Sequence, residues 1–261
     1  MPKTALHFDL ETVRGRLPGR RIEWSDSIDS TMSVAAELAR QGCASGTIVG
    51  AEEQSAGVGR HGRSWLSERG AGLYVSIVLR LRLRAEALPV VMLALGLATR
   101  DAIIDTTALA PDLRWPNDVL IGGQKCAGVL AQLDSDAMIA GIGVNLSQTW
   151  FPENLETPAT SVAMAGAKVT REDVLVVLAG AVDRRLDILA HDGAAAILLA
   201  FTEASSYAEA RRVRAERNGR CIEGVTCGLD PSGFLKIRED NGMETVILAG
   251  GVRPVGETPC S

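Results

Sequence analysis

The segment from Leu88 to Asp105 constrains the fold of this chain more than any other, because it is apolar on nearly every side of a helix. A helix of that composition is buried rather than amphipathic. Runs with the length, branched residues and flanking turns of strands lie around it, at 47–52, 73–83, 113–121, 126–133 and 138–144. These elements predict an α+β fold with a mixed or antiparallel sheet flanked by helices.

Further elements precede and follow this region. Residues 21–24 read as a first strand, and Asp29-Ser30-Thr31 supplies N-cap candidates for a helix over 33–41 that ends at Gly42. Long helical patterns follow at 171–191 and 194–205.

The sequence pattern changes near Arg212. Short alternating stretches are separated there by Asn218-Gly219, by Pro231-Ser232-Gly233 and by Asn241-Gly242. Asn-Gly pairs between alternating runs are strong hairpin signals. We therefore expect a small antiparallel barrel and divide the chain into a main domain, 1–207, and a C-terminal barrel, 208–261.

Composition and charge exclude several classes. The 261 residues are 46% hydrophobic and 23% charged, as in ordinary globular proteins, and no run has the length of a membrane span. The net charge of −5 argues against a general nucleic-acid binder. Five cysteines form no C-x-x-C pair and three histidines are scattered, so we expect reduced thiols, a cytoplasmic protein and no metal site made of protein ligands.

A glycine- and arginine-rich loop, Gln54 to Trp65 (QSAGVGRHGRSW), lies between two predicted strands. Its glycines let the backbone approach an anion, and Arg60 and Arg63 offer planar guanidinium groups to phosphate or carboxylate. The arginines have no evident acidic neighbour in the sequence, so we expect the loop to be mobile until an anion fills it. A solvated surface turn is the alternative.

Lys125 is one of four lysines in a chain with 23 arginines. It follows the Gly122-Gly123 turn and starts an apolar strand, so its ammonium can point into a site from a rigid element. The alternative is a surface lysine at the end of a strand.

Four segments, taken in order, resemble those of the biotin protein ligases: Ser30-Thr31, the Gln54–Trp65 loop, RWPNDVLIGGQKCAG at 114–128 and GIGVN at 141–145. That family carries a GRGRxGRxW loop, a KWPND segment with a K-x-A-G strand, and a GxGxN turn. The resemblance runs from about Ser30 to the C-terminus. It implies an SH3-like C-terminal barrel and ATP-dependent biotinylation of a lysine on a biotin carboxyl carrier protein through biotinoyl-5'-AMP.

The resemblance also implies roles in the chemistry, which consists mainly of positioning and charge stabilisation. Lys125 would bridge the biotin carboxylate and the α-phosphate of ATP, and Arg60 and Arg63 would meet the phosphates and the carboxylate region. Asn117 would lie near adenine. Asp118 would lie near the acyl phosphate, where it holds Mg²⁺ weakly, through the phosphates, or orients the incoming lysine. For Asn117 and Asp118 an Asx-turn is the alternative.

The remaining residues implied by the resemblance contact biotin or the nucleotide. Ser30, Thr31 and Gln54 would contact the ureido ring, although helix capping competes for the first two. Trp65 would cover adenine or pack in the closed loop. The other residues of the set would supply backbone contacts, a wall of the pocket or the GxGxN turn: Gly57, Val58, Gly59, Gly128, Gly143 and Asn145.

Three residues depart from the family pattern. Met32 replaces the usual asparagine of S-T-N, Val58 replaces the first loop arginine, and Arg114 replaces the lysine before W-P-N-D. Because Val58 removes a loop cation, we expect weaker retention of the intermediate rather than lost activity.

Alternative functions remain open. A bifunctional ligase and repressor would need a DNA-binding domain, and residues 1–20 are too short for a helix-turn-helix. A lipoate or octanoate ligase would share the core but lacks the paired loop and W-P-N-D motifs. The expected partner is therefore a carrier domain, without DNA or membrane, and the enzyme is a monofunctional monomer or homodimer.

Overall fold

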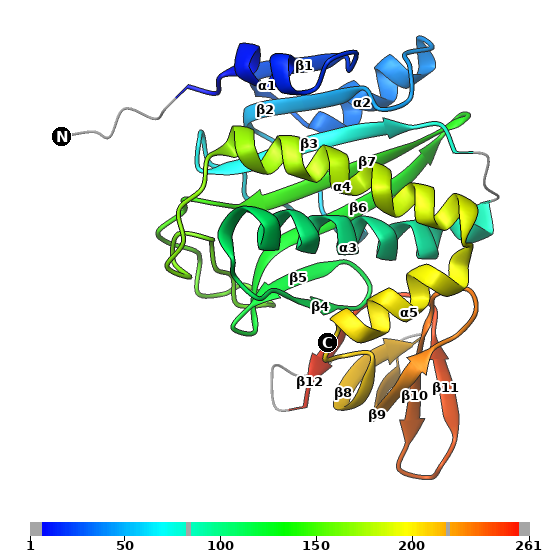
Figure 1. The fold of residues 1–261 in the computed structure, drawn as a ribbon. Coiled ribbons are helices and arrows are strands. Elements are labelled where there is room, and N and C mark those ends of the chain that lie inside the picture. Colours follow the sequence, from blue (N-terminus) through cyan, green and yellow to red (C-terminus); the bar gives the residue numbers. More distant parts are fainter. Residues whose placement is uncertain (1–6, 82–84, 218–219, 256–261) are drawn as a thin grey trace.

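The structure is a computed structural model that describes residues 7–81, 85–217 and 220–255. Within them, seven strands form one sheet in the order β1-β2-β3-β7-β6-β5-β4 (Figure 1). Their bounds are β1 Ile22–Ile28, β2 Ile48–Gln54, β3 Gly72–Leu79, β4 Asp112–Arg114, β5 Asp118–Ile121, β6 Gln124–Asp134 and β7 Ala137–Asn145. β1 and β2 are parallel and the other pairs antiparallel, so the sheet is mixed as predicted.

Helices cover the two faces of this sheet differently (Figure 1). α3 (Leu88–Thr107), α4 (Arg171–His191) and α1 (Leu10–Arg16) lie on one face, and α2 (Thr31–Arg40) lies on the other. Side chains alternate accordingly along β7: Ala140 and Ile142 pack in the main core, while Ile139 packs with α2. The face beneath α2 carries the smaller hydrophobic cluster and therefore has room for a site.

The helix expected to be buried is confirmed as α3. It packs against the sheet, α4 and α5 (Ala194–Ala204), and its one wholly buried hydroxyl, on Thr99, donates to Leu95 O at 2.8 Å. It ends at Ala108, which adopts a left-handed conformation with φ 57°. Because α3 is enclosed, it fixes the spacing between the sheet and the outer helices.

The C-terminal strands form a second, antiparallel sheet of five strands in the described residues, ordered β11-β10-β9-β8-β12. Their bounds are β8 Glu209–Arg217, β9 Arg220–Leu229, β10 Leu235–Glu239, β11 Glu244–Ile247 and β12 Val252–Pro254. The sheet curls so that β11 contacts β8. Asn241-Gly242 joins β10 to β11 as predicted, whereas Asn218-Gly219 lies outside the described residues.

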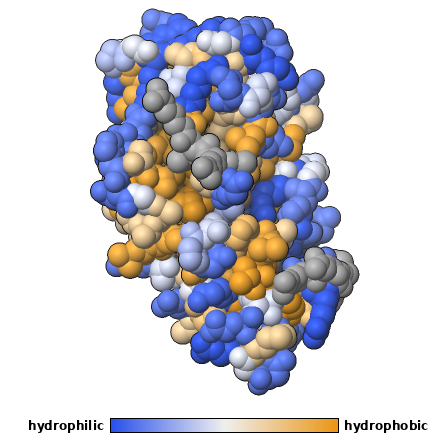
Figure 2. All heavy atoms as spheres, turned by 90° about the vertical axis from the view of Figure 1, so that its right-hand side faces the viewer, coloured by the Kyte–Doolittle hydropathy of each residue, from blue (hydrophilic) through white to orange (hydrophobic). Residues whose placement is uncertain are grey.

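The second sheet is packed onto the first part of the chain. Its buried side chains belong to the same hydrophobic cluster as the main core, and Trp115 Nε1 donates to Gly233 O at 2.9 Å. Seen from the right-hand side of Figure 1, hydrophobic residues gather across the middle of the molecule (Figure 2). Among the described helices, none combines the length and apolar composition needed to cross a membrane.

Three expectations need correction, and one helix was not predicted. The predicted strand 113–121 is a hairpin of β4 and β5, because Trp115, Pro116 and Asn117 form a turn between them. The predicted strand 73–83 ends at Leu79, and residues 82–84 lie outside the described part. Helix α1 escaped prediction, although Asp9 caps it by accepting from Thr12 N. Cys221 is disulfide-bonded, so the expectation of reduced thiols is wrong for that residue.

A buried ion pair ties the N-terminal segment to the sheet and α4. Glu52 Oε2 lies 2.5 Å from Arg171 Nη1, and Glu52 Oε1 accepts from Phe8 N and Trp24 Nε1. Phe8 and Trp24 stack with ring centroids 3.5 Å apart. Burial alone would raise the pKa of Glu52, but the hydrogen bond and charge of Arg171 outweigh it and hold that pKa below its ordinary value.

We predict that Glu52→Gln lowers the free energy of unfolding by about 3 kcal/mol, because it removes the carboxylate from a buried ion pair. Since the folded-state pKa of Glu52 is lowered, its contribution is complete at neutral pH and is lost as the pH falls through that lowered value. Urea unfolding at neutral and at acidic pH measures both effects.

The matched control is Glu23→Gln, which breaks the exposed Arg21–Glu23 pair. It should change the free energy of unfolding by no more than about 1 kcal/mol. If the two variants lost equal free energy of unfolding, burial would not be what makes the Glu52–Arg171 pair stabilising.

Candidate active site

Two adjoining cavities lie at the open end of the main sheet. The larger, about 500 Å³, is enclosed by the 59–66 loop, the β4–β5 hairpin, the 151–159 segment and strands β8 and β12. The smaller, about 50 Å³, lies between the start of α2 and the sheet. Five residues line both: Gly59, Arg60, Trp65, Asn117 and Lys125.

Glycines form the floor of the smaller cavity. Gly128 on β6 pairs with Gly143 on β7, and Gly141 lies two residues before Gly143 on the same face. A Cβ at Gly143 would stand 2.5 Å from Trp65 Cε2, and one at Gly141 would stand 2.6 Å from Met32 Sδ. The G-x-G spacing therefore leaves this face of the sheet without side chains. The side chains of Trp65 and Met32 fill the space.

A β-bulge decides where Lys125 points. In a regular strand, residues three apart such as Lys125 and Gly128 face opposite sides of the sheet. Val119 pairs with Ala127 and Leu120 with Lys125, so Cys126 is an extra residue in β6. Cys126 and Ala127 both enter the core, and a Cβ at Gly128 would lie 3.2 Å from Lys125 Nζ. The bulge thus turns Lys125 onto the face that carries the cavities.

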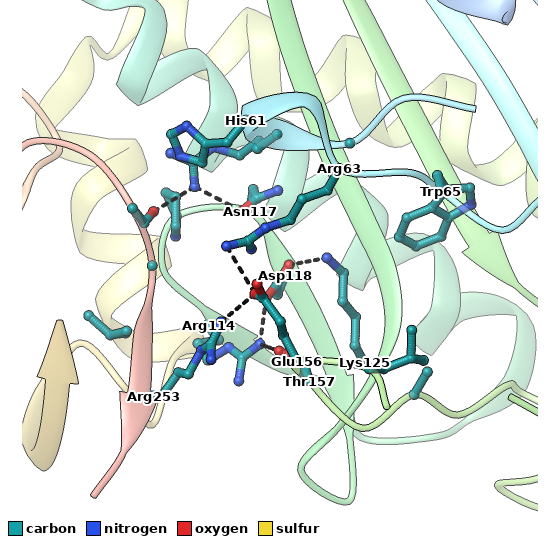
Figure 3. A pocket seen from close by; sticks show the side chains of 18 of the residues that line it. His61, Arg63, Trp65, Arg114, Asn117, Asp118, Lys125, Glu156, Thr157 and Arg253 are labelled. Carbon is teal, nitrogen blue, oxygen red and sulfur yellow. Dashed lines mark hydrogen bonds and ion pairs between the residues drawn. The ribbon is translucent and has the colours of Figure 1, made fainter. Parts of the chain in front are cut away.

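Asp118 holds two cations at the junction of the cavities (Figure 3). Its Oδ1 lies 2.5 Å from Lys125 Nζ and its Oδ2 lies 2.6 Å from Arg114 Nη2, which also donates to Thr157 Oγ1 at 2.7 Å. Burial alone would raise the pKa of Asp118, but the charges of Lys125 and Arg114 outweigh it and lower that pKa. The group is therefore a carboxylate at neutral pH.

The arginines of the loop reach across the larger cavity. Arg60 Nη1 donates to Gly250 O at 2.8 Å and to Asn117 Oδ1 at 3.3 Å, which links the loop to the C-terminal sheet. Arg63 Nη2 lies 2.9 Å from Glu156 Oε2, and Arg253 pairs with the same oxygen (Figure 3). The expectation of no acidic neighbour is wrong for Arg63, because its partner Glu156 is distant in the sequence, whereas the oxygens that Arg60 contacts are uncharged.

Two asparagines of the predicted set support the backbone of the site. Asn117 Nδ2 donates to Val129 O at 2.8 Å. Asn145 Nδ2 donates to Thr160 O at 3.1 Å and to Lys125 O at 3.4 Å. Asn145 thereby fixes the strand segment from which Lys125 projects, a role that the sequence motif does not reveal.

The end of the smaller cavity beside the start of α2 is polar. Ser30 Oγ accepts from Met32 N at 3.3 Å, so Ser30 caps α2 as the alternative interpretation held. Gln54 Oε1 accepts from Thr31 N and its Nε2 donates to Ser67 Oγ, both at 2.8 Å. Gln54 therefore links the start of α2 to the end of the loop.

The structure brings the predicted residues together with one exception. Those facing the smaller cavity only are Ser30, Thr31, Met32, Gln54, Val58, Gly128 and Gly143. Those facing the larger cavity only are Arg63, Asp118 and Asn145. Gly57 lines neither: it is buried, and a Cβ there would stand 2.6 Å from Trp65 O, so it serves the packing of the loop.

Sequence reasoning missed several lining residues. Glu156, Thr157 and Arg253 lie in segments without a motif, and only the fold brings them to the cavity. Ser76, which lines neither cavity but contacts Thr31, had a signal, since it is the one aliphatic hydroxyl in the apolar run LYVSIVL. A wholly buried hydroxyl in such a run implies a specific partner, which here is Thr31.

The charge of the larger cavity suits a polyanion. Six cations line it, Arg60, Arg63, Arg114, Lys125, Arg214 and Arg253, against the three carboxylates of Asp118, Glu156 and Glu216. No group of metal-binding side chains occurs among the described residues. Both oxygens of Asp118 already contact cations, so the geometry favours phosphate binding over a metal held by protein ligands alone.

Comparisons with known proteins agree with this geometry. Residues 24–148 match the family described as "Biotin/lipoate A/B protein ligase family", and residues 211–251 match "Biotin protein ligase C terminal domain". The biotin–[acetyl-CoA-carboxylase] ligase of Mycobacterium tuberculosis is 32% identical over 94% of each chain. The bifunctional ligase/repressor BirA of Bacillus subtilis is 30% identical over 95% of this chain and 78% of its own.

A solved structure is similar as well. The biotin protein ligase from Aquifex aeolicus in complex with biotin and ATP superposes with a TM-score of 0.79 at 29% identity. The match covers 89% of this chain and 97% of that one.

We predict that Cys126, although adjacent to Lys125, is inert toward alkylating reagents. It is wholly buried, and burial raises the pKa of its thiol to about 12, so almost no thiolate exists at pH 8. Iodoacetamide at pH 8, followed by peptide mass spectrometry, should leave Cys126 unmodified in the native protein and modified in denaturant. Rapid modification of the native protein would contradict the bulge geometry.

Proposed function

This chain belongs to the biotin protein ligase family, and we propose that it biotinylates a lysine of a biotin carboxyl carrier protein with ATP, through biotinoyl-5'-AMP. The proposal rests on the position of Lys125. This residue lines both the small cavity, which has a polar end, and the large cationic cavity. A carboxylate in the first and a nucleotide in the second would meet at its ammonium.

The smaller cavity suits biotin once Trp65 moves. Its end carries the polar groups of Ser30, Thr31 and Gln54 for a ureido ring, and its glycine floor would accept the ring system and aliphatic chain. At about 50 Å³ it is smaller than usual ligand pockets, because the indole of Trp65 lies over Gly128 and Gly143. Entry of biotin therefore requires the loop to shift.

The first step would take place beside Lys125. The biotin carboxylate attacks the α-phosphorus, the bond to the bridging oxygen breaks, and pyrophosphate leaves. Lys125 screens the repulsion between the two anions, and Arg60 and Arg63 offset charge on the phosphates. Because Arg63 pairs with Glu156 in this structure, phosphate binding would compete with that ion pair.

In the second step the amine of the acceptor lysine attacks the acyl carbon and AMP leaves. Since the pKa of Asp118 is lowered, its carboxylate is a poor base. We propose that it orients the incoming lysine and keeps Lys125 in place. Asn117 and Trp65 would contribute to the nucleotide side of the site.

Mg²⁺ would enter with the nucleotide. A single carboxylate, Asp118, would approach it, and phosphate oxygens would supply most ligands, because the described residues form no metal-binding group of their own. Its chemical contribution would be to neutralise phosphate charge.

The domain and partner assignments also remain proposals. Residues 1–207 would form the ligase domain and 208–261 a barrel that helps to close the site and presents a surface to the carrier domain. The contacts of Arg60 with Gly250 and of Glu156 with Arg253 support the closing role. We propose a monomer or homodimer in the cytoplasm, where ATP is available.

Two alternatives are less well supported. Lipoate has no hydrogen-bonding group on its dithiolane ring, so it would leave the polar end of the smaller cavity unmatched. A DNA-binding repressor is disfavoured by the net charge of −5 and because described arginines of the C-terminal sheet pair with carboxylates, as in Arg212–Asp240 and Arg238–Glu244.

ATP–pyrophosphate exchange tests the proposal. Biotin should support exchange and lipoate should not, and label from biotin should appear on a purified carboxyl carrier domain. Exchange driven by lipoate instead of biotin would refute the biotin assignment.

We predict that Lys125→Ala lowers biotin-dependent exchange on the order of 10²–10³-fold, because a preorganised charge stabilises the transition state by a few kcal/mol. Lys125→Arg should lose less. Lys236→Ala on β10 serves as the matched lysine control. Near wild-type exchange by Lys125→Ala would remove the observation on which the proposal rests.

A further prediction concerns closure of the loop. Trypsin should cleave after Arg60 or Arg63 in the free protein, and biotin with ATP should protect both positions. Because an exposed ion pair stabilises by at most about 1 kcal/mol, Glu156→Gln should raise cleavage of the free protein by no more than about fivefold.

Glu153→Gln, in the same exposed segment, should leave the cleavage rate unchanged. Equal cleavage with and without ligands would show that the loop does not close over the site.

A further inference from the structure

We propose that Ser76 is a positioning residue that directs the hydroxyl proton of Thr31 into the smaller cavity, toward the carbonyl oxygen of the ureido ring. The inference rests on the proposed function, since it takes biotin as the ligand. It assigns a task to a buried hydroxyl that lies behind the wall of the site.

Ser76 lies in the middle of β3 on the face toward α2. Its side chain is wholly buried, and among the described residues its Oγ has a single hydrogen-bond partner, Thr31 Oγ1, at 2.8 Å. The neighbours Val75 and Ile77 point to the opposite face, into the main core. Ser76 therefore contributes a lone polar group to its side of the strand.

Only one hydrogen can lie between two hydroxyl oxygens. If Thr31 donated to Ser76, the hydrogen of Ser76 would be left in the interior without an acceptor, which is unfavourable. The arrangement without that penalty has Ser76 donating to Thr31. The hydrogen of Thr31 must then point elsewhere.

Thr31 lines the smaller cavity, and its other polar groups are engaged. Its backbone N–H donates to Gln54 Oε1 at 2.8 Å, and as the first residue of α2 its carbonyl faces along the helix. Among the described residues the Thr31 hydroxyl has no acceptor, so its hydrogen is available to a ligand in the cavity that Thr31 lines. Of the acceptors on biotin's bicyclic ring system, the ureido carbonyl oxygen is far stronger than the ring sulfur.

Ser76→Ala removes the donor and lets the Thr31 hydroxyl rotate, while Thr31→Val removes the hydroxyl itself. We expect Ser76→Ala to raise KM for biotin about fivefold and Thr31→Val about tenfold, in line with the loss of one net hydrogen bond. The double variant should equal Thr31→Val, because Ser76 acts only through Thr31. The kcat of exchange and KM for ATP should not change.

Biotin-dependent ATP–pyrophosphate exchange with the four proteins measures these quantities, and thermal unfolding without ligand checks that each one is folded. Desthiobiotin, which keeps the ureido ring but lacks the sulfur, should show the same fivefold effect of Ser76→Ala. Loss of the effect with desthiobiotin would place the acceptor at sulfur and overturn the assignment.

Other outcomes separate the proposals. An unchanged KM in Ser76→Ala, or multiplied effects in the double variant, would overturn the role of Ser76 while wild-type exchange upholds the ligase function. Absence of biotin-dependent exchange in the wild-type protein would overturn the ligase function and, with it, this inference.

Discussion

The buried carboxylate of Asp118 is the interaction on which the site depends. Lys125 and Arg114 carry like charges at the junction of the two cavities, and each lies within 2.6 Å of an Asp118 oxygen. Without that carboxylate the two cations would repel one another in a weakly solvated place. Asp118 thus keeps positive charge fixed where the proposed reaction brings two anions together, and its lowered pKa keeps it ionised.

The sheet makes that arrangement possible because it lacks side chains at three positions and carries a bulge beside Lys125. Gly128, Gly141 and Gly143 clear one face beneath α2, and the bulge at Cys126 turns Lys125 onto the same face. Lys125 and Asp118 therefore lie on strands, while the Gly57–Trp65 loop, with Arg60 and Arg63, and the Glu156 segment lie over them. Rigid positioning and loop closure are assigned to different parts of the chain.

Local signals predicted most of the fold but not its long-range pairings. The buried helix α3, the helix α4 and the Asn241-Gly242 hairpin follow from periodicity and turn chemistry. Periodicity does not predict the hairpin at 113–121, because the turn at Trp115, Pro116 and Asn117 is only three residues long. In the site, glycine and arginine content indicated the loop, the Gly122-Gly123 turn indicated Lys125, and the resemblance added their roles. The Arg63–Glu156 pair and the support given by Asn145 were not predicted, because they depend on contacts between distant segments.

A crystal structure of the protein with biotin and a non-hydrolysable ATP analogue would test the central claim most directly. We expect Lys125 Nζ at hydrogen-bond distance, roughly 3 Å, from both the biotin carboxylate and an α-phosphate oxygen. Asp118 should remain beside it, and Trp65 should have left the floor of Gly128 and Gly143. Biotin bound with its carboxylate away from Lys125, or the nucleotide bound outside the larger cavity, would show that Lys125 does not bring the two substrates together.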